Sequence, residues 1–324
     1  MKVHLLSCET HAEARRHQEA RLRELWELSS KRHELVEDPA EAEMIFVGNV
    51  REQHWFRSLR EHPVVNRYPE RCFLATEGDD WKFPPLLPGV YCSGHRRMAF
   101  PWRYRSASFE LYPPAFKNHY LGTLTARGYE HPKRWLGSFM GRRSHRVRDD
   151  LLALELPQEF LVKDTTSFDV FTHVTEGRAE PQAAFAEILL SSKFALCPRG
   201  SGAGTMRAFE SMQMGVAPVI MSDDWIVPRG VDWSEFAIFV KEKELERLPS
   251  ILRAQEDRHA EMGRKARQAW EQCFAPETFF DYLIEQFVSL RAERKVPEVV
   301  LWKCRDIFVT YGRVKEKLKA LQGK

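Results

Sequence analysis

The stretch that decides the fold runs from Phe194 to Asp224, FALCPRGSGAGTMRAFESMQMGVAPVIMSDD. An apolar run leads into a loop of small residues, a helix-like segment with Arg207 and Glu210 follows, and the apolar run APVIM comes after it. Strand, helix and parallel strand in this order form the βαβ unit of α/β proteins. The stretch therefore predicts a parallel sheet with a ligand-binding loop at the carboxyl end of one strand.

Apolar runs on both sides of this stretch repeat the same alternation with charged segments. The runs VHLLSC, MIFVG, CFLAT and GVYCS predict strands of a first α/β domain, and RWLGSFMG, EFLVKD, KFALC and APVIM predict strands of a second. Residues 83–120, crowded with proline and aromatic residues, are expected to be loop-rich. We predict an N-terminal domain over residues 1–131, a C-terminal domain over residues 132–285 and a basic helical tail over residues 286–324.

The composition is that of a soluble globular protein. Hydrophobic residues make up 43% and charged residues 29% of the 324 positions, a balance typical of chains with a large buried core. The first residues lack the apolar stretch of a signal peptide, and no run approaches the roughly 18 apolar residues that would span a bilayer. The six cysteines are scattered without metal or redox spacing, so we expect buried thiols in a reducing compartment. These features favour the cytoplasm.

The basic tail has two interpretations. Residues 291–324 hold ten Lys or Arg against four Asp or Glu, within a chain of net charge +3. One interpretation is a solvated helix face, and the other is peripheral contact with the anionic inner face of a membrane, helped by Trp302, Phe308 and Tyr311. The single patch of arginines and aromatics at residues 93–105 is too small to indicate nucleic-acid binding in a mildly basic chain.

The small-residue loop itself suggests an anion. Gly200, Gly202 and Gly204 let its backbone approach a ligand without interference from Cβ atoms. Ser201 or Thr205 can cap the following helix, whose first N–H groups and positive dipole end suit a phosphate. The lysine of a P-loop and the dinucleotide fingerprint are both absent from the stretch. The loop thus predicts a phosphate site of another kind, with ordinary turn chemistry as the alternative.

Arg207 and Glu210 follow the loop at a spacing of three, which places both on one helix face within the first two turns. An arginine there can bind a diphosphate, and a carboxylate can accept two hydrogen bonds from ribose hydroxyls. The alternative is a mutual surface salt bridge, which would contribute only about 0–1 kcal/mol and would leave the loop unexplained. The pair therefore favours a nucleotide site.

The stretch, extended to Val240, resembles the signature region of the exostosin-type glycosyltransferases, family 47. The shared features are a strand, a C-P-x-G loop, an R-x-x-E helix, a G-x-x-P-V-I strand and a following W-x-x-F. The segment DPAEAEMIFVG, Asp38 to Gly48, is similar to the run into the second strand of that family's N-terminal domain. The strong match covers roughly 50 residues. A weaker one surrounds RWLGSFMGRRSHRVRDDL, and residues 83–120 match nothing.

The resemblance implies a GT-B architecture, an α/β fold in which two Rossmann-like domains face each other across a cleft and the C-terminal one binds the nucleotide-sugar. It implies an inverting enzyme that uses a UDP-sugar as donor and requires no cofactor or metal. The residues it places near the donor phosphates are Arg199, Gly200, Ser201 and Gly202, with Arg207 beside them, and it places Glu210 on the ribose. We expect the protein to lack the N-terminal membrane anchor of animal and plant relatives, because the sequence looks like a bacterial-type soluble member.

The segment GSFMGRRSHRVRDD is the second candidate group. Several cations follow its predicted strand and should lie at the carboxyl end of that strand: Arg142, Arg143, His145, Arg146 and Arg148. Cations there can stabilise the negative charge that a departing diphosphate gains. The alternative, a solvated helix start, is disfavoured because cations at a helix N-terminus oppose the helix dipole. Arg142 and Arg143 are the preferred candidates, and Lys163, after the EFLV run, is another.

An inverting transfer also needs a base for the proton of the acceptor hydroxyl. Carboxylates and a histidine that follow two predicted strands of the N-terminal domain are the candidates: Glu77, Asp79, Glu9 and His11. Asp223 and Asp224, after APVIM, could instead contact the donor sugar. The twelve histidines show no metal-ligand spacing with a matching carboxylate, so no metal site is predicted.

We therefore predict a cytoplasmic inverting glycosyltransferase, hexosyl- or glycuronosyltransferase-like, that moves a sugar from a UDP-sugar to an oligosaccharide or lipid-linked saccharide in polysaccharide or glycolipid assembly. Two alternatives use the same scaffold. One is a nucleotide-sugar epimerase or hydrolase, and the other is a non-catalytic nucleotide-sugar-binding subunit. Acceptor-dependent release of UDP distinguishes transfer from both.

Overall fold

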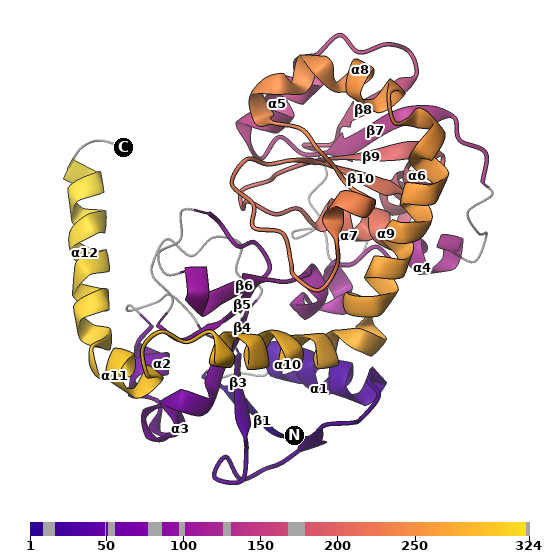
Figure 1. Cartoon of the computed structure of the whole chain (residues 1–324). Helices are drawn as coiled ribbons and strands as arrows, with labels where there is room; N and C mark the ends of the chain where they lie inside the picture. The colour runs from indigo at the N-terminus through magenta and orange to yellow at the C-terminus, as the bar shows by residue number, and fades with distance from the viewer. Residues whose placement is uncertain are drawn as a thin grey trace. The chain divides into compact units, whose positions relative to one another are not determined.

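The computed structural model of the chain describes residues 1–8, 17–48, 50, 56–76, 86–96, 101–125, 131–167 and 179–321. The chain divides into two compact units: unit 1 comprises Met1–Ala107 and Pro276–Lys324, and unit 2 comprises Ser108–Ala275. Each unit contains a parallel sheet with helices packed on it (Figure 1). The predicted α/β class, with two units that are each built on a parallel sheet, is confirmed.

Unit 1 is built on a six-stranded sheet of order β2-β1-β3-β4-β5-β6, whose paired strands run parallel. Every residue of β3 and β4 is buried, as expected for strands covered on both faces. The strands are β1 (Lys2–Ser7), β2 (Glu34–Leu35), β3 (Met44–Gly48), β4 (Cys72–Thr76), β5 (Gly89–Tyr91) and β6 (Tyr104–Ser106). The helices are α1 (His17–Leu28), α2 (Arg57–Glu61), α3 (Pro63–Arg67), α10 (Pro276–Ala292), α11 (Glu298–Lys303) and α12 (Arg305–Leu321).

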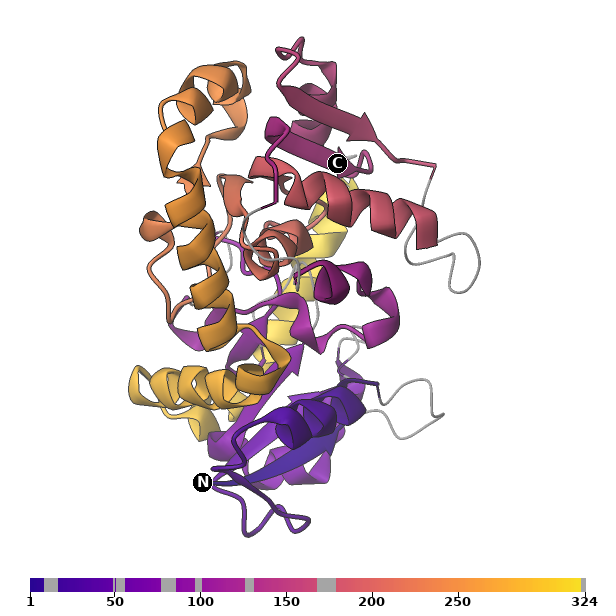
Figure 2. The same ribbon diagram turned by 90° about the vertical axis from the view of Figure 1, so that its right-hand side faces the viewer.

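The long helix α10 returns the chain to unit 1. Phe287 of α10 meets Phe46 of β3 edge-on with ring centroids 4.8 Å apart, and it stacks on Phe73 of β4 at 4.9 Å. In both views α10 lies beside α1 (Figure 1, Figure 2). The chain therefore divides after residues 107 and 275, whereas we predicted divisions after 131 and 285. Periodicity indicates that a segment is helical, but it does not say which sheet the apolar face covers.

The strand β6 lies in the region that we expected to be loop-rich, so that expectation is only partly correct. Arg105 of β6 is buried and forms an ion pair with Glu293 at 2.6 Å. Arg103, just before the strand, is also buried and forms an ion pair with Glu298 of α11. A strand that carries buried arginine lacks the apolar alternation that usually identifies strands in a sequence. These ion pairs also attach the C-terminal helices to the sheet.

Unit 2 is built on a five-stranded parallel sheet of order β11-β10-β9-β7-β8. Its core lies between the sheet and the helices packed on it, with Phe139, Phe194 and Leu248 among the buried side chains. The strands are β7 (Trp135–Gly141), β8 (Phe160–Asp164), β9 (Ser192–Pro198), β10 (Ala217–Met221) and β11 (Ile238–Phe239). The helices are α4 (Tyr120–Thr125), α5 (Arg146–Ala153), α6 (Ala179–Leu190), α7 (Met206–Gln213), α8 (Leu248–Arg253) and α9 (His259–Cys273).

The cysteines match their predicted state. All six are free thiols; five are buried and Cys304 is partly exposed. Burial raises the pKa of the Cys197 thiol to about 12, so this thiol stays protonated and unreactive near neutral pH. Among the helices that the structure describes, none combines the length and apolar character needed to cross a membrane.

Candidate functional site

The small-residue loop, residues 199–205, connects β9 to α7 at the carboxyl end of the central strand of unit 2. The backbone N–H of Arg199 donates to the carbonyl of Met221 at 3.1 Å, and the hydroxyl of Ser222 donates to the carbonyl of Ala203 at 2.7 Å. Both bonds hold the loop against the end of β10. Ligands of parallel sheets bind beyond the carboxyl ends of the strands, so the loop lies where a ligand is expected.

The glycines of this loop allow close packing rather than unusual backbone angles. In the described parts of the chain, glycine adopts a positive φ at Gly215 and Gly230 and not within the loop. A Cβ atom on Gly200 would lie 3.2 Å from Nη2 of Arg148 and 3.4 Å from Oγ of Ser144. Gly200 therefore lets the loop approach the segment that follows β7.

The helix α7 begins directly after the loop. Thr205 occupies the N-cap position, as predicted, but its side chain makes no capping hydrogen bond, and Ser201 is exposed within the loop. The first turn of α7 carries no acidic side chain. The positive end of this helix is therefore not compensated by a carboxylate of its own first turn, which favours an anionic ligand.

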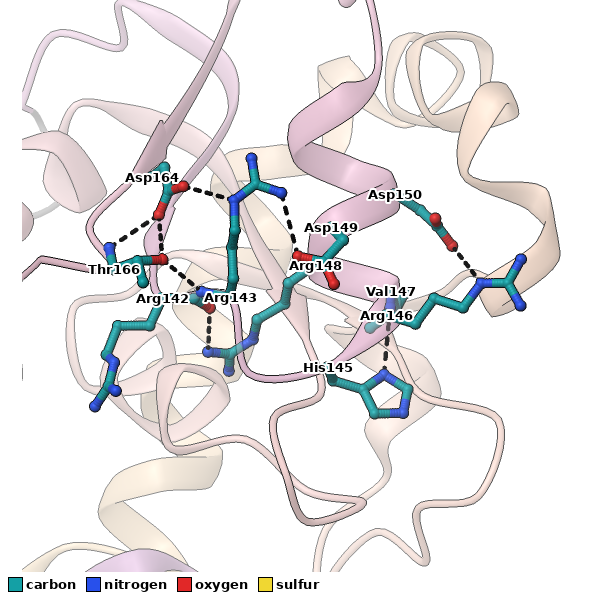
Figure 3. A network of polar contacts seen from close by, with 10 residues as sticks. All are labelled: Arg142, Arg143, His145, Arg146, Val147, Arg148, Asp149, Asp150, Asp164 and Thr166. Atoms are coloured by element: carbon teal, nitrogen blue, oxygen red, sulfur yellow. Dashed lines mark hydrogen bonds and ion pairs between the residues drawn. The ribbon is translucent and has the colours of Figure 1, made fainter. Parts of the chain in front are cut away.

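Arg148 of α5 joins the loop to the segment after β7. Its guanidinium donates to the carbonyl of Arg199 at 2.9 Å, of Arg142 at 3.2 Å and of Pro198 at 3.3 Å. Figure 3 shows the bond to Arg142 within the surrounding polar network. Each of these three bonds goes to a backbone carbonyl. The sequence indicates this arginine only as one of several cations, because the carbonyls of Pro198 and Arg199 lie 50 and 51 positions away in the chain.

Arg199 turns inward rather than toward an open phosphate site. Its side chain is buried, and Nε donates to the carbonyl of Gly202 at 3.2 Å. Nη1 lies 3.6 Å from a carboxylate oxygen of Asp224 and 3.9 Å from one of Glu242. Two carboxylates therefore compensate its charge. The predicted contact of Arg199 with donor phosphates stays a prediction, and the structure adds Asp224 and Glu242 as its partners.

Arg207 packs against the end of β7. Its Nη2 donates to the carbonyl of Met140, and its guanidinium lies 4.6 Å from the ring centre of Phe139 and 5.4 Å from that of Phe185. A Cβ on Gly141 would lie 2.9 Å from Nη2 of Arg207, so this packing depends on glycine there. Among the described residues, no partner engages Nε of Arg207.

Glu210 lies one helical turn after Arg207 and has a different environment. Its carboxylate is partly buried, and no hydrogen bond or ion pair engages it among the residues that the structure describes. The mutual salt bridge that the sequence left open is therefore not formed. Burial raises the pKa of Glu210, and the nearby Arg207 opposes this only in part. An unpartnered, desolvated carboxylate is costly, and binding sites are where such groups occur most often.

The cations after β7 differ in how far their charges are compensated. Arg143 is exposed, and its guanidinium contacts Asp164 at 2.7 Å and Asp149 at 3.2 Å (Figure 3). Hydrogen bonds from Thr166 and from Arg143 lower the pKa of Asp164 to about 2, so this carboxylate is ionised. Arg143 thus has its charge neutralised, which weakens it as a diphosphate ligand.

Arg142 and Lys163 are the other two predicted cations. Arg142 is partly buried, and Lys163 is exposed on β8 opposite Met140 of β7. Within the described residues, no ion pair or hydrogen bond occupies the ammonium of Lys163. The described part of the chain therefore does not compensate the charge of Lys163 at the carboxyl edge of the sheet.

His145 does not add to the cations at this edge. It is the N-cap of α5, and its Nδ1 accepts a hydrogen bond from the backbone N–H of Val147 at 3.3 Å (Figure 3). Burial lowers the pKa of His145, and the nearby guanidinium groups of Arg199 and Arg148 lower it further. The imidazole is consequently neutral at neutral pH and acts as a hydrogen-bond acceptor, so the prediction that it is one of the cations is wrong.

The four candidates for the base lie outside the described residues: Glu9, His11, Glu77 and Asp79. They stay predictions. In the part of the chain that the structure describes, no group of three or more His, Cys, Asp or Glu side chains could hold a metal ion. The described residues thus place a helix N-terminus, several cations and the desolvated carboxylate of Glu210 at one edge of the sheet of unit 2. This chemistry would suit a ligand that carries both phosphates and hydroxyl groups.

The role of Arg148 can be tested by removing its hydrogen bonds while keeping the length of its stem. We expect Arg148→Met to lower the stability of unit 2 by about 2–4 kcal/mol, since three carbonyls lose a charged donor. Hydrogen exchange in β7 and β9 measures this. Arg146→Met is the matched control because Arg146 is exposed and, among the described residues, forms an ion pair with Asp150 at 3.6 Å, one turn along α5 (Figure 3). Equal effects of the two variants would contradict the role.

Comparison with known sequences identifies related proteins. The sequence model of the exostosin GT47 domain matches residues 60–255, more than half of the chain. The chain is 34% identical over 90 residues to an exostosin-1 homolog of Caenorhabditis elegans, a match that covers 27% of this chain and 24% of the relative. It is 35% identical over 92 residues to a probable glucuronosyltransferase of Oryza sativa subsp. japonica, covering 28% and 20% of the two chains.

Among solved structures, an alpha1,3-fucosyltransferase overlaps 92% of this chain and 91% of its own, with 13% sequence identity and a TM-score of 0.40. The segments that match the nematode and rice sequences amount to about a quarter or less of the length of those two proteins. The domain match includes β9, the small-residue loop and α7 in full. The chain belongs to the exostosin GT47 domain family.

Proposed function

We propose that the protein is an inverting glycosyltransferase that moves a sugar from a UDP-sugar to a saccharide acceptor, without a required metal or cofactor. Membership of the exostosin GT47 domain family supports transfer of a sugar, and the name of the rice relative, a probable glucuronosyltransferase, supports a nucleotide-sugar donor. The donor's diphosphate is assigned to the carboxyl edge of unit 2, formed by the small-residue loop, the first turn of α7, Lys163 and Arg148.

The main support for this proposal is the environment of the Glu210 carboxylate. Its carboxylate lies on the second turn of α7, just behind the loop, and burial raises its pKa without any hydrogen bond from the described residues to offset the cost. Two neighbouring hydroxyls of a ribose would each donate a hydrogen bond to it. The ligand would thereby supply hydrogen-bond partners that the described residues do not.

The proposed reaction is a single displacement. The oxygen of an acceptor hydroxyl attacks the anomeric carbon of the donor, the bond from that carbon to the diphosphate oxygen breaks, and UDP leaves with the electron pair. The hydroxyl proton passes to a base, for which Glu9, His11, Glu77 and Asp79 are the candidates. Positive charge at the carboxyl edge of unit 2 stabilises the negative charge that develops on the leaving UDP.

Incubation of the purified protein with UDP-sugars and saccharide acceptors tests the proposal. We expect release of UDP that depends on the acceptor. Conversion of the donor without acceptor would indicate an epimerase or hydrolase, and binding without turnover would indicate a binding subunit. UDP at about 100 times its Kd should stabilise the protein by about 2.7 kcal/mol. If no nucleoside diphosphate or nucleotide-sugar raises the melting temperature, the nucleotide site is refuted.

A further inference from the structure

The last helix of unit 1, α12, exposes a continuous apolar stripe. Its members are 50–67% exposed and follow one another at spacings of four, three and four residues: Ile307, Tyr311, Val314 and Leu318. These spacings place them on one face of the helix. Val309 and Gly312 lie on the other side of α12 and are buried. The helix therefore covers its own unit with one face and leaves an apolar face without a partner among the described residues.

The charged residues of α12 favour an anionic surface over a neutral one. At 3.6 residues per turn, Arg313 and Lys317 lie along one border of the stripe, and both are exposed. Asp306, an acidic residue of the same helix, is paired with Arg60 at 2.8 Å, so its charge is compensated within unit 1. In the sequence, residues 305–321, which form α12, carry five basic residues against two acidic ones. The apolar stripe is thus bordered by an excess of positive charge.

We propose that the stripe of α12 docks on the surface of an anionic lipid bilayer, with the helix axis in the plane of the interface. Apolar side chains on one face with cations beside them are the pattern of helices that lie at such interfaces. Long basic side chains can keep their charge at the headgroups while their stems lie beside the acyl chains. Anionic headgroups supply the complementary charge.

A second copy of the chain is the other occupant that an exposed helical stripe could have. The stripe covers residues 307–318, which is less than two heptads, whereas a stable coiled coil needs about three or more. Pairing of two copies would also bring the cations that border each stripe together, and like charges at such positions oppose association. Length and charge therefore favour the bilayer.

Cosedimentation of the full chain with vesicles tests this proposal. We expect binding to vesicles of phosphatidylcholine and phosphatidylglycerol in a ratio of about two to one, little binding to phosphatidylcholine alone, and loss of binding as the salt concentration approaches about 1 M. Equal binding to both kinds of vesicle, or no binding to either at low salt, would overturn the proposal. So would concentration-dependent dimers in sedimentation velocity that disappear when the stripe is altered.

Variants of the stripe provide the second measurement. Ile307→Ser/Leu318→Ser should lower the vesicle partition coefficient about tenfold, because two side chains no longer enter the interface. Arg313→Gln/Lys317→Gln should weaken binding to the anionic vesicles and reduce its dependence on salt. The matched control is Phe239→Ser, because Phe239 is 53% exposed but lies on β11 of unit 2. Unchanged partition of the Ile307→Ser/Leu318→Ser variant would overturn the assignment to α12.

This inference is independent of the proposed sugar transfer, and the same samples distinguish the two. The stripe variants should keep the melting shift that UDP produces, since the donor is assigned to unit 2. A UDP shift with no vesicle binding would refute the docking surface alone. Vesicle binding without any shift from a nucleoside diphosphate would refute the nucleotide site alone.

Discussion

Replacement of Glu210 by glutamine should weaken the binding of UDP by about 10- to 100-fold and leave the ligand-free protein at least as stable as the wild type. Two hydrogen bonds from ribose hydroxyls to a carboxylate are charge-assisted, and each contributes about 1.5–3 kcal/mol where it is well formed. Glutamine keeps the shape of the side chain but removes the charge. Titration calorimetry with UDP measures the affinity.

The stability of the Glu210→Gln variant provides an independent check through its pH dependence. Burial raises the pKa of Glu210 above its ordinary 4.5, so the stability linked to this carboxyl is present below pH 4.5 and is lost as the pH rises through the raised value. The ionised carboxylate therefore destabilises the folded protein at neutral pH. Glutamine does not titrate, so the melting temperature of the variant should exceed that of the wild type more at about pH 8 than at about pH 5.

A matched control is available in the same unit. Glu246 is exposed and belongs to the segment before α8, so Glu246→Gln should change neither the affinity for UDP nor the pH dependence of melting. If Glu210 only stabilised the fold, the Glu210→Gln variant would have a lower melting temperature than the wild type and an unchanged affinity for UDP. That pattern would refute the ribose role.

Arg103→Met should destabilise unit 1 by about 3–5 kcal/mol, because it leaves the buried carboxylate of Glu298 without its counter-ion. Both side chains are at most 5% exposed. Nη1 and Nη2 of Arg103 each donate to one carboxylate oxygen at 2.7 Å, and Nη2 also donates to the carbonyl of Leu86 at 3.0 Å. Hydrogen exchange in β4 and α10 measures the loss, since two units need not unfold together.

The pH dependence and a second substitution test the cause of that loss. Burial already raises the pKa of Glu298 despite the attraction of Arg103, so removal of the arginine should raise it further. The variant should then recover stability as the pH falls and the carboxyl takes up a proton. Arg103→Met/Glu298→Gln should recover most of the loss at neutral pH, because no buried charge is left.

The control for this pair is an ion pair of the same type at the surface. Arg57 and Glu61 are both more than 60% exposed, one turn apart on α2, and contact each other at 3.0 Å. Arg57→Met should change the stability of unit 1 by no more than about 0.5 kcal/mol. If Arg103→Met costs no more than this control, the buried pair does not stabilise the attachment of α11.

The order of strands and helices in unit 2 could be predicted because each element has its own pattern of apolar and polar residues in the local sequence. The apolar runs became β7, β8, β9 and β10, and the segment from Thr205 became α7. The position of the small-residue loop at a strand end follows from that order alone. The strand β6 could not be found in this way, since its buried Arg105 depends on Glu293, almost two hundred positions away in the chain. No window of local sequence contains that pairing.

The sequence by itself determined the α/β class, the βαβ order around Phe194 to Asp224, and the motif that places the chain in the exostosin GT47 domain family. These properties rest on short-range periodicity and on residues close together in the chain. Only the tertiary structure decided that α10 belongs to unit 1, that Arg199 is compensated by Asp224 and Glu242, and that burial raises the pKa of Glu210 with no hydrogen bond or ion pair to it from the described residues. Burial and charge compensation depend on distances between residues that are remote in sequence, so they exist only once the chain has folded.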